Sequence, residues 1–134
     1  MLSEKPLLPS VPFRECPIQV SLGVLGRKWT MLILRDIGFL KVDRFNQIMR
    51  ATPGLTPRIL SLRLSQLEEA GFLRRVETDH SVRWALTDKG EDTLPLLLGF
   101  IEFGSKWNAD EVFEDKRPRR LSELFPGLPL RKVA

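Results

Sequence analysis

One stretch, from Thr56 to Gly71, constrains the fold more than any other part of the chain. Thr56 is a residue type that caps free backbone N–H groups, and Pro57 suits the first position of a helix. Gly71 readily takes the left-handed conformation found just past a helix end. The apolar residues between them recur at helical spacing and predict one buried face, made by Leu60, Leu64, Leu67 and Gly71, with Ile59 and Ala70 beside them.

On the opposite face of this predicted helix, the two halves differ in charge. Its first half carries small or basic outward residues, namely Pro57, Arg58, Ser61, Leu62 and Ser65, whereas Glu68 and Glu69 lie in its second half. Such a helix can press its N-terminal half into a DNA major groove and keep its acidic end clear of phosphate. An ordinary amphipathic surface helix has the same pattern, so the helix alone leaves both interpretations open.

Two shorter helices are predicted just upstream. The first runs from Lys28 to Ile37, and its inward residues are Trp29, Leu32, Ile33 and Ile37. The second covers 43–50 with Asp43 as its cap, and its inner face consists of Phe45, Ile48 and Met49. A Pro53-Gly54 turn leads into the helix from Thr56, so the three helices fit a helix-turn-helix arrangement. Before them, 18–25 predicts a short helix broken around Gly23 and Gly26.

A change of period after Gly71 predicts a β-hairpin. The segments 73–77 and 82–86 are rich in strand formers, and Val82, Trp84 and Leu86 alternate onto one face. A hairpin directly after a helix-turn-helix is the wing of a winged helix. Arg75 and Arg83 on its strands and His80 at its tip are candidate sugar-phosphate contacts. The alternative is a solvated hairpin that only closes the core.

The last predicted helix begins at Thr87, runs to about Asn108 and is apolar on two sides. One side consists of Leu94, Leu97, Leu98 and Ile101, and the other of Leu96, Phe100, Phe103 and Trp107. A chain this small has one core, so the second side predicts a homodimer interface, because exposed aromatic side chains are costly. Pro95 predicts a kink or a delayed helix start.

Composition narrows the classes of function. With 134 residues, a net charge of +4 and a pI of about 9.6, we expect one basic domain with a polyanionic partner. One cysteine and one histidine leave no disulfide framework, metal site or Cys/His nucleophile set, and a Gly-rich phosphate loop is lacking. We therefore expect no enzyme and no cofactor. The sequence shows neither a membrane-length apolar run nor a signal peptide, which favours a cytoplasmic, nucleoid-associated protein.

The two ends of the chain differ from the middle. Residues 1–13 hold three prolines among apolar residues and predict an extended arm, either packed on a partner subunit or disordered. Residues 109–134 predict a C-terminal tail that is partly irregular, with 121–134 expected to be irregular. The basic run Lys116-Arg117-Pro118-Arg119-Arg120 either follows the DNA backbone or is a solvated tail.

The ordered set of motifs resembles the HxlR family of winged helix-turn-helix transcriptional regulators, which are relatives of the MarR group. The residues that carry the resemblance are Cys16-Pro17, Gly26-Arg27-Lys28-Trp29-Thr30, Ile33-Leu34-Arg35, Arg44-Phe45-Asn46-Gln47-Ile48, 53–60, Arg63-Leu64, 67–71, Arg74-Arg75 and 86–90. The hairpin departs from the family pattern, because it is short, lacks prolines at its tip and has Trp84 where a tyrosine is common.

The resemblance implies a mostly α, α+β fold. A winged helix-turn-helix domain over 14–108 would carry an additional long C-terminal dimerisation helix. It also implies a homodimer that binds an inverted repeat in double-stranded promoter DNA, as repressor or activator. Two recognition helices would then enter successive major grooves about 34 Å apart. A winged-helix module that binds a protein instead of specific DNA is the alternative function.

These expectations give the DNA-binding candidates their roles. Arg58 and Ser61 are the predicted base readers, since arginine to guanine is the commonest specific pairing, and Leu62 could touch a thymine methyl. Thr56, Lys28 and Arg44 sit near helix starts and are candidate phosphate contacts, with plain surface charge as the alternative for the two basic residues. The full predicted set is Lys28, Arg44, Thr56, Pro57, Arg58, Ser61, Leu62, Ser65, Arg75, His80 and Arg83.

Two further residues receive separate expectations. Arg63 falls on the inner face of the helix from Thr56, so we expect it to be structural and paired with a carboxylate such as Asp36 or Asp43. Cys16 matches a position where some family members carry a redox- or electrophile-sensing cysteine. The alternative for Cys16 is an inert, partly buried cysteine. Separately, Trp29, Trp84 and Trp107 could line a pocket for a small-molecule effector, but core packing is the favoured role for these tryptophans.

Overall fold

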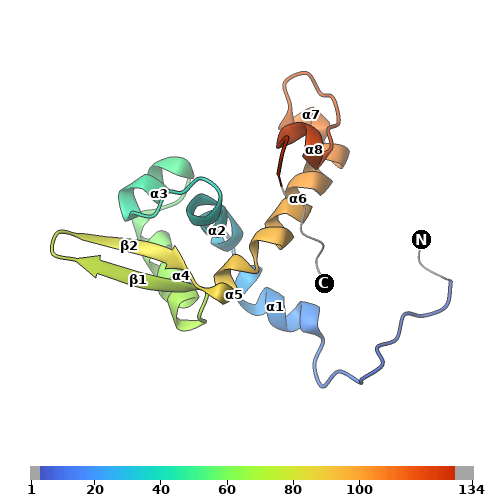
Figure 1. Ribbon diagram of the computed structural model, residues 1–134, viewed down its shortest axis with the longest axis horizontal. Coiled ribbons are helices and arrows are strands. Elements are labelled where there is room, and N and C mark those ends of the chain that lie inside the picture. Colours follow the sequence, from blue (N-terminus) through green and yellow to red (C-terminus); the bar gives the residue numbers. More distant parts are fainter. Residues whose placement is uncertain (1–3, 129–134) are drawn as a thin grey trace.

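The computed structural model describes residues 4–128, and it is mostly helical with one two-stranded antiparallel sheet (Figure 1). Residues 1–3 of the expected arm and 129–134 of the expected tail lie outside the described residues. The elements, in chain order, are α1 (Pro17–Leu25), α2 (Thr30–Gly38), α3 (Phe45–Ala51), α4 (Pro57–Glu69), β1 (Leu73–Thr78), β2 (Ser81–Leu86), α5 (Asp88–Glu91), α6 (Leu94–Trp107), α7 (Ala109–Val112) and α8 (Leu121–Leu124).

Helix α4 begins and ends where its sequence signals predict. The Thr56 hydroxyl accepts a hydrogen bond from the Ile59 N–H at 3.2 Å, and Gly71 has a φ of 85°, in the left-handed region. Leu60, Leu64 and Leu67 are buried, as expected. The chain can turn directly from α4 into the hairpin because glycine has no Cβ to clash in this conformation.

The core lies between α2, α3 and α4. Ile33, Leu34 and Ile48 are fully buried and pack with the α4 leucines. The expectation that Leu32 faces the core is wrong, since its side chain is 38% exposed. At about 100° per residue, Ile33, Leu34 and Ile37 share one side of α2, and Leu32 points nearly opposite to the centre of that side.

Two expected helix boundaries also differ in the structure. Helix α1 ends at Leu25 with Gly26 as its C-cap, as expected, but it runs unbroken through Gly23, because an exposed glycine weakens a helix by about 1 kcal/mol without stopping it. Helix α3 has Arg44, not Asp43, as its N-cap residue. The side chain that binds free N–H groups at this end is Gln47, whose Oε1 accepts hydrogen bonds from Asp43 N and Arg44 N at 3.3 Å.

The hairpin packs its apolar face on the helices and projects from the body beside α3 and α4 (Figure 1). In the register of β1 and β2, Arg75 lies opposite Trp84 and Val76 lies opposite Arg83. Trp84 is buried, and its backbone N–H donates to the Asp43 carbonyl at 2.9 Å. This bond fixes the hairpin to the entrance of α3.

The expected long C-terminal helix is two helices. Thr87 caps α5 by accepting from the Gly90 N–H at 3.1 Å, the chain turns at residues 92–93, and α6 begins at Leu94. Pro95 lies in the first turn of α6, where a missing N–H costs nothing, so the delayed start is confirmed and the continuous helix is wrong.

The segment after α6 folds back onto it instead of leaving the body. Arg119 N donates to the Ser105 carbonyl at 3.2 Å, and Ser105, Ala109 and Leu121 are buried. The expectation of irregular structure is therefore wrong for Leu121–Leu124, which forms α8. Within residues 4–128, none of the helices is long and apolar enough to cross a bilayer.

Candidate nucleic-acid interface

The outward row of α4 is open along its first half. Thr56, Pro57, Arg58, Ser61, Leu62 and Ser65 are all exposed. Among residues 4–128, no side chain forms a hydrogen bond or ion pair with the Arg58 guanidinium, so its donors face solvent. Glu68 and Glu69 are exposed at the other end of the helix. The row therefore offers a basic, small-residue end to a ligand and holds its acidic end apart.

Arg63 joins α4 to the loop before α2. Its Nε donates to the Lys28 carbonyl at 2.8 Å and its Nη1 donates to Gln66 Oε1 at 3.1 Å. The expected pairing with Asp36 or Asp43 is wrong, because Asp36 is already occupied by other donors. Arg63 thereby ties the backbone of Lys28 to α4. The Lys28 side chain is exposed, with Nζ 5.2 Å from the centre of the Trp29 ring.

A buried carboxylate, Asp36, one of those expected to pair with Arg63, holds the turn before α4 through other partners. Asp36 is fully buried and accepts hydrogen bonds from Arg35 Nη2 at 2.7 Å and from the Thr52 hydroxyl at 2.6 Å. Arg35 Nη2 also lies 3.1 Å from the Thr52 hydroxyl oxygen. A buried charge needs such partners. The triad connects α2 to the end of α3, so it fixes where the chain enters α4.

A cleft of about 310 Å³ separates α4 from the hairpin. It is lined by Phe45, Ser61, Leu64, Ser65, Glu68, Arg75, Val82 and Trp84. The structure thus brings the predicted residues Ser61, Ser65 and Arg75 around one hollow. Arg75 also pairs with Glu77, with Nε 3.0 Å from Oε1, and its Cζ lies 5.8 Å from the Trp84 ring centre.

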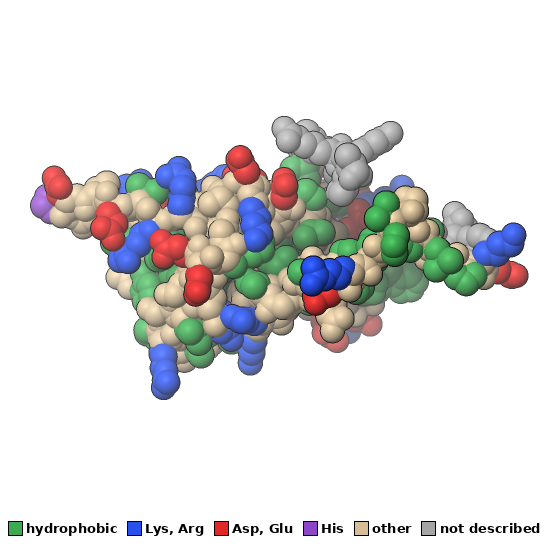
Figure 2. Space-filling model, turned by 90° about the horizontal axis from the view of Figure 1, so that it is seen from below, with side chains coloured by type: hydrophobic (Ala, Val, Ile, Leu, Met, Phe, Trp, Pro, Cys, Tyr) green, Lys and Arg blue, Asp and Glu red, His purple; other side chains and the backbone are tan. Residues whose placement is uncertain are grey.

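The other predicted wing residues do not converge on this cleft. Arg83 pairs in register with Val76, so it lies on the face of the hairpin opposite to Arg75. His80 is exposed at the tip beside Asp79. Arg44 is exposed where α3 meets the hairpin. Figure 2 shows basic side chains projecting from this end of the molecule with acidic ones among them, so the surface is mixed in charge.

Comparison with known proteins identifies the family. The family model described as HxlR-like helix-turn-helix matches residues 24–112. A helix-turn-helix-type transcriptional regulator from Synechocystis is 36% identical over 102 residues, covering 74% of this chain and 75% of the relative. The chain belongs to the HxlR-like helix-turn-helix family. YdzF of Bacillus subtilis, also a helix-turn-helix-type transcriptional regulator, is 32% identical over 94 residues, covering 68% and 86%.

Solved structures agree with this HxlR-type assignment. PA1607, a candidate transcription factor, superposes with a TM-score of 0.66 at 32% identity, covering 79% of this chain and 72% of its own. The oxidised form of the redox regulator HypR superposes with a TM-score of 0.58 at 33% identity, covering 66% and 94%. The expected mostly helical winged helix-turn-helix fold is confirmed. The protein is a transcriptional regulator with a DNA-binding helix-turn-helix domain, and its family is not an enzyme family.

Outside the helix-turn-helix of this HxlR-type chain, α6 presents a second apolar row to solvent. Leu96, Phe100, Phe103 and Trp107 are 50% to 66% exposed. Their spacing of three and four residues places them on one side of the helix. Leu97 on the other side is buried, so the two-sided pattern predicted from the sequence is present in α6.

The remaining predicted residues are dispersed over the HxlR-type fold. Cys16 is a free, exposed thiol at the N-cap of α1. Trp29 and Trp84 pack on the core whereas Trp107 is exposed, so the three tryptophans do not form one pocket. In the described part of the chain, His, Cys, Asp and Glu form no group of three that could hold a metal.

The basic run 116–120 lies away from α4 and the hairpin, beside α7 and α8 (Figure 1). Arg119 Nη1 donates to Asp115 Oδ1 at 2.8 Å, and this hydrogen bonding lowers the pKa of the Asp115 carboxyl from 3.8 to about 2. The Arg119 guanidinium also lies 4.5 Å from the Phe113 ring centre. This arginine is therefore engaged within the fold.

Proposed function

We propose that this HxlR-like regulator binds as a homodimer to an inverted-repeat operator, with the first half of α4 in the major groove of each half-site. The observation that carries the proposal is the open outward row of α4, in which Arg58, near the N-terminal end, has no side-chain partner among residues 4–128. In a symmetric dimer, two such helices about 34 Å apart reach consecutive major grooves on one side of the duplex. Promoter occupancy then represses or activates transcription, on the nucleoid in the cytoplasm.

The exposed residues in the outward row of α4 have chemical roles in this proposal. Arg58 has the planar fork that matches guanine O6 and N7, Ser61 bonds a base edge, and Leu62 contacts a thymine methyl. Pro57 and Ser65 line the same face. The Thr56 oxygen accepts the capping bond, which leaves its O–H free to donate to phosphate.

Backbone contacts come from the residues around α4. Lys28 and Arg44 are exposed near the starts of α2 and α3 and bind phosphate. In the hairpin, Arg75 gives up its ion pair with Glu77 and binds a phosphate on the side facing α4. The exposed ion pair adds little stability, so breaking it costs little free energy. Arg83 and His80 reach sugar-phosphate from the outer face and the tip of the wing.

The apolar row of α6 supplies the dimer contact. Burying a Phe or Trp side chain is worth about 1.5–3 kcal/mol, so pairing the rows of two subunits gives a strong driving force. A single chain leaves all four side chains in contact with water. We propose that Leu96, Phe100, Phe103 and Trp107 meet their symmetry copies, which sets the separation of the two α4 helices.

An effector is a further part of the proposal. Cys16 is an exposed thiol, the form that an oxidant or electrophile can reach, and HypR, at 33% identity, is a redox regulator. Diamide or a quinone should therefore weaken operator binding by the wild-type protein and leave the Cys16→Ser variant unaffected. Equal responses of the two proteins in an anisotropy titration would remove Cys16 as a sensor.

A salt titration separates DNA binding from the alternative of a winged helix that docks on a protein. For a mixed-sequence duplex, the logarithm of the binding constant should fall linearly with the logarithm of the salt concentration, because each neutralised phosphate releases about 0.9 counterion. Arg44→Ala removes one contact from each subunit, so the slope should fall by about 2. Arg117→Ala, in the segment beside α7 and α8, is the matched control and should leave the slope unchanged. Salt-independent binding, or none, would contradict the proposal.

A further inference from the structure

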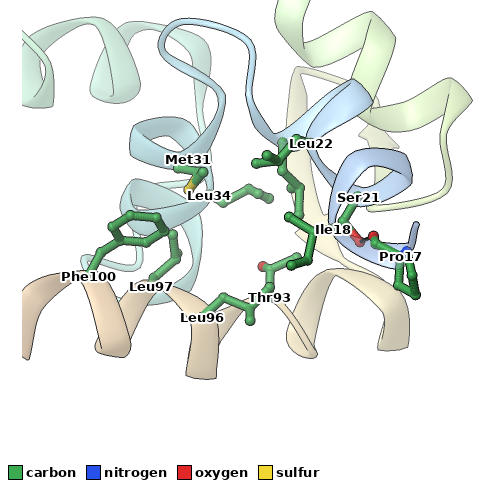
Figure 3. Close-up of a pocket in the computed structure, with 11 residues that line it drawn as sticks. Pro17, Ile18, Ser21, Leu22, Met31, Leu34, Thr93, Leu96, Leu97 and Phe100 are labelled. Atoms are coloured by element: carbon green, nitrogen blue, oxygen red, sulfur yellow. Dashed lines mark hydrogen bonds between the residues drawn. The ribbon is translucent and has the colours of Figure 1, made fainter. Parts of the chain in front are cut away.

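An apolar groove of about 320 Å³ lies between the three helices α1, α2 and α6 (Figure 3). Helix α1 contributes Ile18 and Leu22, α2 contributes Met31 and Leu34, and α6 contributes Leu96 and Phe100. The floor is buried, whereas Ile18, Leu22, Leu96 and Phe100 on the rim are exposed. Figure 3 shows the side chains of α1 and α6 facing one another across the space. The groove is suited to an apolar segment and offers it few polar partners.

The N-terminal arm carries large apolar side chains that are exposed to solvent. All of residues 4–13 are exposed, and Leu7, Leu8, Val11 and Phe13 are 59% to 83% exposed. The arm leaves the start of α1 and points away from the body (Figure 1), and Figure 2 shows green side chains along its length. Four large apolar side chains on a short segment predict that it docks on another surface.

The spacing of prolines fixes the shape in which the arm can dock. Pro6, Pro9 and Pro12 recur every third residue, which is the repeat of a polyproline II helix. Leu7 and Phe13 then share one edge of that helix, and Leu8 and Val11 share another. The three prolines lack N–H donors, so the arm is a poor strand for a sheet edge and presents side chains instead. A stiff, extended segment also loses little entropy when it binds.

We propose that the arm of one subunit lies in the apolar groove of the other subunit. The inference rests on the proposed dimer, because Leu96 and Phe100 belong both to the groove and to the apolar row of α6. A partner that covers this row is therefore already at the rim of the groove. The ten residues 4–13 span about 31 Å as polyproline II, and the fourteen residues of α6 span about 21 Å. The arm is therefore long enough to run along the whole of α6 at the rim of the groove.

Exchange between subunits fits the chain direction better than folding back. Pro17 lines one end of the groove, and the preceding chain leaves that end pointing outward. Pro12 and Pro17 both restrict the backbone between the arm and α1, which limits a sharp reversal there. The family match begins at residue 24, so the arm and most of α1 lie outside the matched segment.

Site-directed cross-linking between subunits tests the exchange. In a Cys16→Ser background, one chain carries Val11→Cys in the arm and a co-expressed, longer-tagged chain carries Ser21→Cys in the groove. A short bismaleimide should join the two different tags. The matched pair, Val11→Cys with Asn46→Cys on the exposed side of α3, should not be joined. A chain carrying both Val11→Cys and Ser21→Cys, co-expressed with a cysteine-free chain, reports folding back by a cross-link within one chain.

The outcomes distinguish this inference from the proposed function. Light scattering is recorded on the same samples. A dimer with the inter-subunit cross-link supports the exchange, whereas a dimer with only an internal cross-link, or with none, overturns the exchange and leaves the dimer standing. A monomer would overturn both.

An arm variant gives the energetic readout. Replacing Leu7, Leu8, Val11 and Phe13 by serine should raise the dimer Kd by about 100-fold. Both arms of the dimer then lose their apolar contacts with the grooves. Ser10→Ala in the same arm is the control and should leave the dimer Kd unchanged. Circular dichroism should be the same for all three proteins, because the arm contributes nothing to the core. An unchanged dimer Kd for the serine variant would contradict the proposal.

Discussion

Replacing Phe100 and Phe103 together by glutamate should give a folded monomer that no longer binds its operator tightly. Both side chains are 62% exposed in the single chain, so the core does not need them. In the proposed dimer they are buried on both subunits. Four aromatic side chains at about 1.5–3 kcal/mol each amount to most of the free energy of a typical dimer. Four glutamates placed against one another add repulsion, so dimerisation at micromolar concentration should disappear.

Sedimentation equilibrium measures whether the variant is a monomer, and thermal unfolding followed by circular dichroism measures whether it is folded. The mass should fall to that of one 15.4 kDa chain, with circular dichroism that still shows the helical fold. Operator affinity should fall by at least about 100-fold, because a single subunit holds only one half-site. Glu102→Gln, on the exposed surface of the same helix, is the control and should remain dimeric. A double variant that keeps the dimer mass would show that α6 is not the interface.

Arg58→Ala should cause the largest loss of sequence preference of any single substitution in α4. A bidentate arginine–guanine contact discriminates by about 1–3 kcal/mol, and the dimer loses two such contacts. The Arg58 guanidinium forms no hydrogen bond or ion pair within the described part of the chain, so the stability of the protein should be unchanged. Anisotropy titrations on the preferred site and on a site with one base pair changed in each half-site measure the ratio of affinities, which should approach one.

Arg58→Lys separates charge from geometry at the same position. Lysine keeps the positive charge but lacks the planar fork, so binding to mixed-sequence DNA should survive while the preference for guanine falls. Arg117→Ala, distant from α4, should behave as the wild type. If Arg58→Ala retained the full affinity ratio, Arg58 would not be a base reader.

The parts of the fold that sequence predicts well are those set by neighbouring residues. The cap at Thr56, the turn at Gly71 and the alternation of Val82, Trp84 and Leu86 all act over a few positions. Their physics is local, because capping bonds, backbone freedom and strand alternation do not depend on distant partners. The bounds of α4 and of the hairpin follow closely from these signals.

Contacts between distant segments were beyond this kind of prediction. Arg63 pairs with the carbonyl of Lys28, 35 positions away, and Asp36 pairs with Thr52, 16 positions away. Periodicity places Arg63 and Asp36 on inner faces but does not choose their partners. The sequence did contain a signal that Asp36 is buried, because it lies three positions after Ile33 and one before Ile37, on the apolar side of the helix. A buried carboxylate needs hydrogen-bond donors around it.

The C-terminal half shows a second limit of prediction, in which tertiary packing overrides local pattern. Residues 92–93 interrupt the predicted helix, although Pro95 indicated where α6 would begin. The polar segment after α6 has weak periodicity, yet Leu121 is buried against α6 and α8 forms around it. The roles of individual residues in DNA binding and in the dimer stay predictions.

Selection of bound sequences from random DNA tests the pairing of two α4 helices most directly. The wild-type protein should recover two half-sites in inverted orientation with centres about 10 base pairs apart, since one helical turn brings consecutive major grooves to the same side of the duplex. A recovered pool without symmetry, or one enriched in a single isolated half-site, would contradict the account.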